Sequence, residues 1–529
     1  MIARAEPPTL ASKPLQGISG SLTPPLRLFN ATLDFLDENE SPHAYLADAL
    51  PQLNADTWRV FPDGRMETTH RLRPNLTWHD GTTLSADDFV FGWRVYASPE
   101  LGNSGSVPIS EMEEVVARDA STVVIRWRRP YPDAARMDQT FQALPRHLLE
   151  QPFQTLDALG FSNHPFWTID YVGLGPYKVD RWEGGSFIEA LAFEGHALGR
   201  PKIERLRLSF IGDANTALAN LLAGDAHYLS DYVLWNQEGR TLEAEWAARG
   251  GGGVVFFAPV LMRITHVQQR PEFAAPIALL DLRVRKALSH AIDAPSAVEA
   301  LTGGRGLLTP TLTSPAADYF QEIDRVVAKY PFDPRRAQQI LDEAGFVKGS
   351  DGFYVSPPDL GGEPLKLEAW FSAGSDEERE NAILVDSLRK IGVDASSKVT
   401  PVAMVRDAQA RSTTPGISTG GAGAGRLADF TSDGIPGPQN RWQGNNRGGW
   451  SHPDYDRWHR AFSTTLDPPQ RIQHLAQMER VLSEDVGAIP YFFTIVVTAR
   501  AGNLTGPVLR KTPDAGIGPQ RAHTWEWTS

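Results

Sequence analysis

Apolar and polar residues follow two different periods along this chain. They alternate over residues 66–72 and 365–371, and a period of two predicts strands with one buried face. Over residues 282–291 and 334–344 the apolar residues recur instead at spacings of three and four, which predicts helices with one buried face. Strands and helices that follow one another in this way indicate an α/β protein.

Several predicted helices begin at residues that can satisfy free backbone amides. Asp281 and Asp333 each precede a helical pattern, where a carboxylate can accept hydrogen bonds from the first turn. Ser375 with Glu378 resembles a capping box for a helix that ends near residue 391. This helix lies between two predicted strands, so we expect a βαβ unit with parallel strands.

Residues 172–193 predict a sharp corner followed by a hairpin. Gly173 and Gly175 permit backbone angles that a side chain would forbid, and Pro176 fixes φ. The chain can therefore turn sharply before a strand begins. Gly184 and Gly185 separate two short β-like runs, which predicts a two-stranded hairpin.

Composition narrows the class of protein. The 529 residues include 41% hydrophobic residues, enough for substantial cores in two or three domains. The formal charge of −13 comes with no basic block, so we expect no nucleic-acid partner. No apolar run approaches the ~20 residues that span a bilayer, so we expect no membrane insertion. The absence of cysteine excludes disulfides and thiolate metal sites.

One motif raises the possibility of an enzyme. Residues 416–420 fit Gly-x-Ser-x-Gly, which would make Ser418 the nucleophile of a hydrolase. That motif requires a strand before the serine and a helix after it, and neither pattern is evident. The sequence has no zinc-protease or phosphate-loop motif, and its histidines are scattered. We therefore expect no catalytic residue, no metal and no cofactor, and keep the Ser418 hydrolase as an alternative.

Residues 412–451 differ in composition from the rest of the chain. Gly, Ser, Asn and Pro dominate this segment and no hydrophobic period is evident, which predicts a long loop. A long loop within a compact domain is often functional, and the alternative is a surface excursion. Both interpretations remain open from composition alone.

Four motifs resemble a known family. They are Gly-Leu-Gly-Pro-Tyr at 173–177, Trp-His-Asp-Gly at 78–81, Leu-Asp-Leu-Arg-Val-Arg at 280–285 and Phe-Asp-Pro at 332–334. Together with further ordered matches over roughly residues 40–500, they are similar to the family 5 extracellular solute-binding proteins. That family comprises the oligopeptide-, dipeptide- and nickel-binding receptors of bacterial ABC importers.

The resemblance implies a fold. It is the two-lobed periplasmic-binding-protein fold of class II type, in which two strands cross between α/β lobes. We expect the first lobe at residues 1–256, with an extra subdomain at about 41–165. The second lobe is expected at 257–491, and residues 492–529 are expected to return to the first.

The resemblance also implies a function. The protein would capture a short peptide or another polar small molecule between its lobes, close around it and deliver it to an ABC transporter permease. We expect a periplasmic monomer, with this sequence representing the mature form because its first residues lack the pattern of a signal peptide. Besides the hydrolase, a ligand-binding module that feeds a membrane sensor remains an alternative.

The ligand is left open by departures from the family pattern. Peptide receptors of the family hold the peptide's amino terminus with an Asp near an Asp-Pro pair, whereas this chain offers Asp429 and Asp433 without that pair. A peptide, an opine and a sugar conjugate all remain possible. The expected ligand contacts are Phe29, Asn30, Trp167 and Trp235 in the first lobe, and Gly421, Gly423, Arg426, Asp429, Asp433, Arg441, Trp442 and Trp450 in the second.

Overall fold

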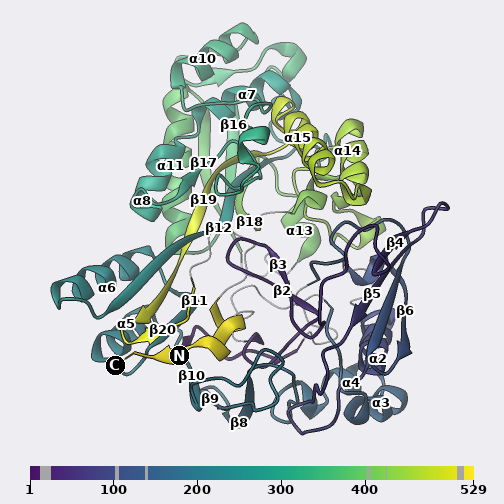
Figure 1. The fold of residues 1–529 in the computed structure, drawn as a ribbon. Helices are drawn as coiled ribbons and strands as arrows, with labels where there is room; N and C mark the ends of the chain where they lie inside the picture. Colours follow the sequence, from purple (N-terminus) through teal and green to yellow (C-terminus); the bar gives the residue numbers. More distant parts are fainter. Residues whose placement is uncertain are drawn as a thin grey trace. The chain divides into compact units, whose positions relative to one another are not determined.

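The computed structural model divides into two compact units (Figure 1). Unit 1 comprises Met1–Ala258, Val496–Lys511 and Ala515–Ser529, and unit 2 comprises Pro259–Ile495 and Thr512–Asp514. The chain passes from unit 1 to unit 2 within strand β12 (Gly253–Val267) and returns within strand β19 (Ile489–Ala501). The structure describes residues 1–11, 26–101, 107–137, 141–401, 404, 407–423, 426–508 and 518–528.

The larger sheet of unit 1 has the strand order β11-β1-β10-β9-β8, and β19 pairs with β11. Helices α5 (Ala214–Ala223) and α6 (Asn236–Ala248) bury Leu221, Leu242 and Trp246 in the core that this sheet shares with them. The predicted hairpin is confirmed, because β8 and β9 pair antiparallel on either side of Gly184 and Gly185. The strands are β1 (Ile2–Ala3), β8 (Tyr177–Glu183), β9 (Phe187–Ala192), β10 (Arg205–Phe210) and β11 (Tyr228–Leu234).

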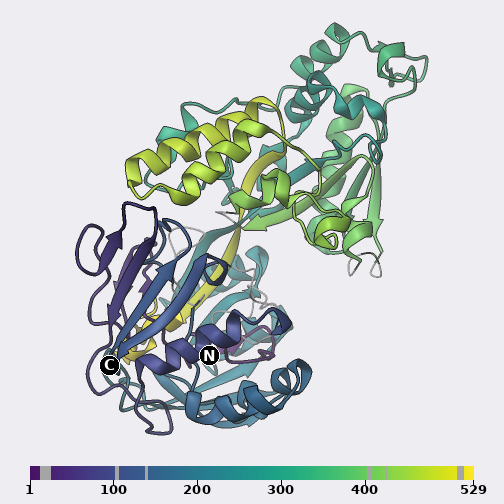
Figure 2. The ribbon, with the colours of Figure 1, turned by 90° about the vertical axis from the view of Figure 1, so that its right-hand side faces the viewer.

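A separate four-stranded sheet of unit 1 has the order β4-β5-β7-β6. Helix α2 (Ala86–Tyr96) packs against β6 and β7, as Figure 2 shows. The strands are β4 (Trp58–Val60), β5 (Met66–Arg71), β6 (Met112–Asp119) and β7 (Thr122–Trp127), and the helices α3 (Arg146–Thr155) and α4 (Ala158–Ser162) follow. Shorter strands of unit 1 are β2 (Asp34–Leu36), β3 (Pro42–Ala44), β20 (Leu504–Thr505) and β21 (Glu526–Trp527).

The sheet of unit 2 has the strand order β17-β16-β18-β12-β19 and carries helices on both faces. Val267 and Ala369 pack in one core with α7, α8, α10 and α11, whereas Met262 and Ile264 pack in another with α14 and α15. The elements are β16 (Lys366–Ser372), β17 (Asp394–Thr400), β18 (Ile417–Gly423), α7 (Leu282–Ala291), α8 (Ala294–Thr302), α10 (Pro334–Glu343), α11 (Ser375–Ile391), α14 (Pro453–Thr464) and α15 (Pro468–Glu484).

Local predictions in unit 2 are largely confirmed. β16 and β17 pair in parallel around α11, which is the predicted βαβ unit. Asp281 accepts a hydrogen bond from the amide of Arg283 at 2.7 Å, and Asp333 caps α10 in the same way. The capping box at Ser375 is wrong, because Ser375 is already the first helical residue and Gly374 holds the cap position.

The corner before β8 has a different cause from the one that we predicted. Neither Gly173 nor Gly175 adopts a positive φ, so the glycines are not needed for their backbone angles. They are needed for space: a Cβ at Gly175 would lie 2.4 Å from the carbonyl carbon of Phe29, and one at Gly173 would lie 2.1 Å from its oxygen. The corner packs directly on the backbone of residues 28–30, and the amide of Gly175 donates to Phe29 O at 3.0 Å.

His79 fixes this corner from its other side. Its Nδ1 accepts from the amide of Gly173 at 3.1 Å, and its Nε2 donates to the carbonyl oxygen of Gly175 at 3.0 Å. These contacts require the neutral ring, and burial lowers the pKa of His79 to about 4. The imidazole therefore joins two loops of unit 1 and has a structural role.

Residues 412–451 are not one long loop, which corrects the prediction. Residues 417–423 form β18, which pairs antiparallel with β12 and parallel with β16. Glycine, serine and alanine carry no hydrophobic period, so this strand depends on hydrogen bonds to neighbours far away in the sequence. Short helical turns follow it at η8 (Leu427–Phe430), η9 (Ser432–Gly434) and η10 (Pro438–Asn440), and α13 (Ala408–Ser412) precedes it.

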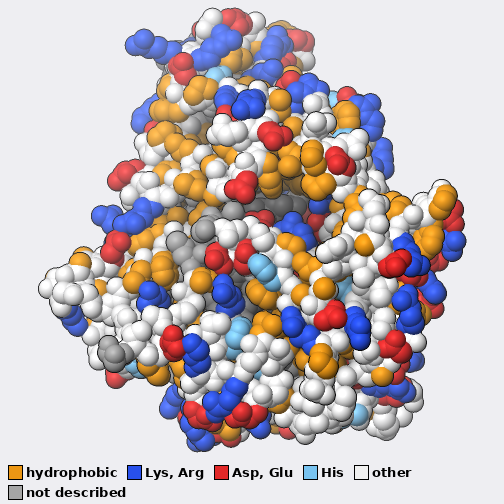
Figure 3. Space-filling model, viewed as in Figure 1, with side chains coloured by type: hydrophobic (Ala, Val, Ile, Leu, Met, Phe, Trp, Pro, Cys, Tyr) orange, Lys and Arg blue, Asp and Glu red, His pale blue; other side chains and the backbone are white. Residues whose placement is uncertain are grey.

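Acidic and basic side chains are interspersed on the face of the molecule shown in Figure 3. This distribution gives no single-sign surface on that face, in keeping with a chain that has 64 acidic and 51 basic residues. Among the helices of the described residues, none is both long and apolar enough to cross a membrane.

Candidate functional site

Residues 426–450 follow β18 in unit 2 and form an ordered loop. The buried side chain of Asn446 donates to the carbonyl oxygens of Thr431 at 3.1 Å and Trp450 at 2.7 Å. Asp456 of α14 accepts from the amide of Ser432 at 2.9 Å and from its hydroxyl at 2.6 Å. These bonds tie the middle of the loop to its end and to a helix, so the side chains that it carries have defined positions.

Asp429 is the carboxylate at the centre of this loop. Its side chain is 19% exposed and lies 3.0 Å from the guanidinium Nε of Arg426. The side-chain amide of Asn445 donates to its other oxygen at 3.2 Å. Burial raises the pKa of Asp429, while Arg426 and Asn445 act in the opposite direction. Arg426 and Asn445 thus offset only part of the cost of burying the charged carboxylate, so an additional cationic partner would stabilise it.

Positive charge exceeds negative charge among the side chains near Asp429. Burial lowers the pKa of the Arg447 guanidinium, and the nearby charges of Arg411 and Arg426 lower it further, whereas Asp429 raises it. The buried Nε of Arg411 has no hydrogen-bond partner among the described residues. Arg426 and Arg447 therefore act on the Asp429 carboxylate, and Arg411 adds a third positive charge beside Arg447, an arrangement that an anionic group would stabilise.

The adjoining surface of β18 and β12 combines an imidazole with bare backbone. His266 stacks on Phe430 of η8, with ring centroids 6.1 Å apart, and lies opposite Ser418 in the strand pair. Burial and the charge of Arg447 lower the pKa of His266 to about 3, so the ring is neutral at pH 7. Gly420 faces the same side as Ser418, and a Cβ there would meet nothing within 4 Å. The strand therefore offers open space for a group that approaches its backbone.

The opposite side of the same strand pair carries a buried ion pair. Arg263 of β12 binds Glu380 of α11 through two nitrogens, with Nε 3.1 Å from Oε1, and Tyr491 also donates to this carboxylate. The guanidinium Nη1 lies 3.5 Å from where a Cβ on Gly421 would stand. A Cβ at Gly421 would make an ordinary van der Waals contact with the ion pair, so space does not require glycine at that position.

The structure brings some of the predicted contacts together in unit 2. Arg426 and Asp429 form an ion pair, and Asp433 and Arg441 are exposed on the same loop. Arg441 and Trp442 adopt positive φ values of 53° and 63° at the end of η10, an unusual conformation for two successive side chains. Gly421 and Gly423 lie in β18, opposite Arg263 and Leu261.

Three predicted contacts of unit 1 lie in its packed interior and are corrected. Phe29 and Trp167 are each 0% exposed, and the indole of Trp167 donates to Phe161 O at 2.8 Å. Asn30 is 8% exposed, and its side chain bonds Leu26 O and the hydroxyl of Tyr171. These side chains have internal partners and no free face for a ligand. Trp235 is 44% exposed and remains a prediction.

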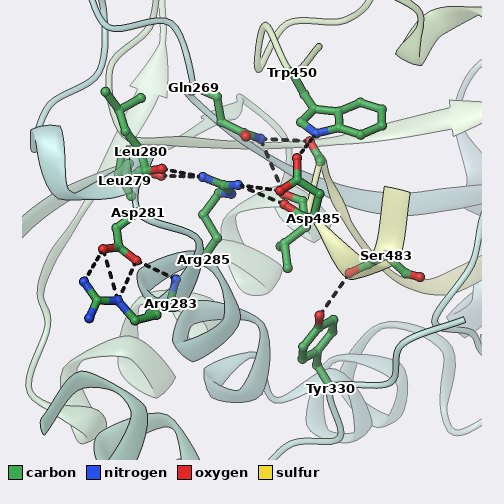
Figure 4. Close-up of polar contacts among 12 residues, drawn as sticks. Gln269, Leu279, Leu280, Asp281, Arg283, Arg285, Tyr330, Trp450, Ser483 and Asp485 are labelled. Carbon is green, nitrogen blue, oxygen red and sulfur yellow. Dashed lines mark hydrogen bonds and ion pairs between the residues drawn. The ribbon is translucent and has the colours of Figure 1, made fainter. Parts of the chain in front are cut away.

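Trp450 is also corrected from a ligand contact to a structural residue. It is 2% exposed, and its indole nitrogen donates to the Asp485 carboxylate at 2.6 Å (Figure 4). Arg285 of α7 donates to the backbone oxygen of Asp485 at 2.9 Å and to that of Leu280 at 2.8 Å. Trp450, Asp485 and Arg285 therefore join α7 to the end of α15 and to the loop.

Sequence reasoning missed Arg411, Arg447, Asn445 and His266. Arg447 and Asn445 lie in the segment that composition had marked, but no spacing distinguished them from its other polar residues. Arg411 precedes β18 and His266 lies in β12, and only the strand pairing brings them near the loop. Among the described residues, no group of three His, Asp or Glu side chains is placed to hold a metal ion.

Comparison with known proteins identifies the family. The model of bacterial extracellular solute-binding proteins, family 5 (middle), matches residues 49–432. A putative ABC transporter peptide-binding protein of Brucella ovis is 26% identical over 298 residues, which cover 56% of this chain and 52% of that protein. The chain therefore spans about half the length of this relative. The oligopeptide-binding protein AppA of Bacillus subtilis is 26% identical over 376 residues, with 69% of this chain and 62% of AppA covered.

The fold is shared with solved structures. The oligopeptide binding protein of Thermus thermophilus, in complex with a pentapeptide, has a TM-score of 0.76 at 20% identity and covers 100% of this chain and 96% of its own. This likeness confirms the predicted two-lobed α/β binding-protein fold. Because the family model matches most of the chain, the protein belongs to family 5 of the bacterial extracellular solute-binding proteins.

Proposed function

We propose that this protein is an extracytoplasmic receptor that captures a peptide-like or other polar small molecule and delivers it to an ABC importer. Membership of family 5 supports this proposal, as do relatives named as peptide-binding proteins of ABC transporters. The mature protein would act as a monomer in the periplasm. Closure of the two lobes around the ligand, which the resemblance implies, stays a prediction.

The observation that carries the proposal is the pairing of unlike charges on the loop after β18. Asp429 is partly buried with an elevated pKa, and the guanidinium groups of Arg411, Arg426 and Arg447 outnumber it. A ligand with an ammonium group and a carboxylate would complete both halves of this site. Its ammonium would bind Asp429, and its carboxylate would bind Arg447 and Arg411.

A zwitterion of moderate size is therefore the proposed ligand class. Short peptides and opines both carry an amino group and a carboxylate, whereas a neutral sugar lacks both charges. The open space at Gly420, beside the imidazole of His266, would accommodate the part of the ligand between its charged ends. We propose peptides or amino-acid conjugates ahead of sugar conjugates on this ground.

The ligand class is tested first by native mass spectrometry of the purified protein, with denaturation to release any bound molecule. Calorimetric titration with di- and tripeptides and with octopine follows. Losing one charged contact in Asp429→Asn or Arg447→Met would weaken binding by about 2 kcal/mol, or roughly 30-fold in Kd. Asp454→Asn is the matched control, because Asp454 pairs with Arg457 at 3.1 Å on the surface of α14.

Unchanged affinity in both site variants would refute the assigned site. Binding of neutral sugars alone would refute the zwitterion. Delivery is tested separately by uptake of the labelled ligand into cells that lack the gene, which the wild-type gene should restore and the Asp429→Asn gene should not. Normal uptake in the deletion strain with loss of a cellular response would favour the alternative, a module that feeds a membrane sensor.

The hydrolase hypothesis is wrong. Ser418 lies inside β18, paired with strands on both sides, and not at a turn between a strand and a helix. A serine in the middle of a sheet lacks the exposed position and the adjacent free amides that stabilise an oxyanion. His266 lies opposite it, but this imidazole is held near Arg447 with its pKa lowered to about 3, too low for a general base at neutral pH.

A further inference from the structure

Unit 2 contains a cavity that shares no residue with the loop after β18. Its volume is about 440 Å³, and it lies between the C-terminal half of α15, the junction of α7 and α8, the start of β19 and residues 324–332. Small-molecule sites in proteins occupy about 300–1,000 Å³. The cavity therefore has the size of a ligand site and belongs to one compact unit.

A bridging segment, residues 328–333, forms one wall of the cavity. At one end the amide of Ala328 donates to Ser483 Oγ at 3.0 Å. The hydroxyl of Tyr330 donates to Ser483 O at 3.0 Å, as Figure 4 shows. At the other end His290 Nδ1 donates to Pro331 O at 2.8 Å, and the amide of Asp333 donates to His290 O at 2.9 Å. The segment thus joins α15 to α7, which gives the cavity a fixed wall.

The charged groups of the lining are neutralised or bonded within the protein. Asp324 pairs with Lys329 at 2.7 Å. The buried carboxyl of Glu479 accepts from the amide of Leu312 at 3.1 Å and from the hydroxyl of Thr313 at 3.0 Å. Burial raises the pKa of Glu479 to about 7, so this carboxyl is a weak counter-charge at neutral pH. A charged ligand would therefore lose its hydration at a larger cost than a neutral molecule.

Most of the remaining lining is apolar, and part of it contacts water. Leu308 is 50% exposed and Phe332 is 37% exposed, and both lie at the cavity. Pro310, Pro331 and Pro490 add rigid rings to the wall. Covering such surfaces with an apolar molecule removes them from water at little cost in side-chain entropy, because proline rings have almost no freedom to lose.

We propose that this cavity is a second binding site, which takes a neutral and predominantly apolar small molecule. The site is independent of the polar ligand captured at Asp429, since the two share no residue. The occupant would lie against Leu308 and Phe332 and contact the first residues of β19, the strand that continues into unit 1.

The probe for this site is N-phenyl-1-naphthylamine, a neutral apolar fluorophore whose emission rises when it leaves water. The wild-type protein should show a saturable increase that corresponds to one bound probe. Ala328→Phe places a ring in the cavity from the bridging segment, keeps the backbone bond to Ser483 and should weaken the probe's Kd by roughly tenfold or more. Ala317→Phe is the matched control, because Ala317 is similarly half-buried in unit 2 but does not line the cavity.

Leu308→Glu is the second variant, since Leu308 is half-exposed and a charge there should also expel the probe without disturbing the core. The proposal is overturned if the wild type shows no saturable signal, or if neither cavity variant weakens it. It is also overturned if the wild type forms a dimer that Ala328→Phe abolishes, because the occupant is then a second copy of the chain. Calorimetric titration with di- and tripeptides should give the same Kd in wild type and Ala328→Phe.

Discussion

Glu380→Gln is predicted to destabilise unit 2 far more than the loss of an ordinary surface charge. The Glu380 side chain is 4% exposed and that of its partner Arg263 is 10% exposed, so both charges are removed from water. Glutamine keeps an oxygen that can accept from Tyr491, but it leaves the buried guanidinium without the carboxylate that it binds. Removing one member of a buried ion pair costs about 3–5 kcal/mol.

The assay is differential scanning calorimetry of the full-length protein. For a unit of this size, about 1 kcal/mol shifts Tm by about 2–4 °C, so the transition of unit 2 should fall by about 6–20 °C. Asp386→Asn is the control on the same helix. Asp386 pairs with Lys390 at 2.5 Å, but the two side chains are 63% and 64% exposed, and such pairs contribute about 1 kcal/mol or less.

The double variant Arg263→Met, Glu380→Leu separates the cost of an unpaired charge from the contribution of the pair itself. Replacing a whole buried ion pair by apolar residues of similar size is often neutral or stabilising, so the double variant should be more stable than Glu380→Gln. If Glu380→Gln lowers Tm no more than Asp386→Asn does, then burial is not what makes this ion pair important, and the reasoning fails.

Two further predictions concern the corner of unit 1. Gly175→Ala should lower the free energy of unfolding of this unit by about 3 kcal/mol, because the new Cβ would overlap the backbone of Phe29. Gly184→Ala is the control, since its Cβ would have its nearest neighbour at 3.9 Å and should cost much less. Chemical unfolding measures both losses, and equal losses would contradict the close-packing explanation. Burial lowers the pKa of His79 from 6.5 to about 4. At a pH between 4 and 6.5 the unfolded chain therefore binds a proton at His79 that the folded chain does not. The free energy of unfolding falls as the pH falls through this range. Between pH 7 and pH 5 the wild type should lose about 2 kcal/mol more than His79→Gln in denaturant titrations, and an equal loss in both proteins would show that His79 does not contribute.

The sequence by itself determined the features that depend on neighbouring residues. Asp281 and Asp333 cap helices because a carboxylate reaches amides two or three residues further along. The hairpin at Gly184 and the βαβ unit around α11 likewise follow from periodicity and turn residues within short windows. The order of such motifs was specific enough to indicate the family and its two-lobed fold.

Only the tertiary structure decided which polar and aromatic residues could bind a ligand. Trp450 and Asn30 were plausible contacts by residue type, and their burial against internal partners became evident only in the folded chain. β18 has no hydrophobic period, and it exists because distant strands supply its hydrogen bonds. The charges of Arg411 and Asp429 both act on Arg447 across segments that folding brings together, and burial raises the pKa of Asp429 and lowers that of Arg447. Periodicity reports contacts within a few residues, whereas binding sites are assembled from contacts between segments far apart in the sequence, which no local pattern records.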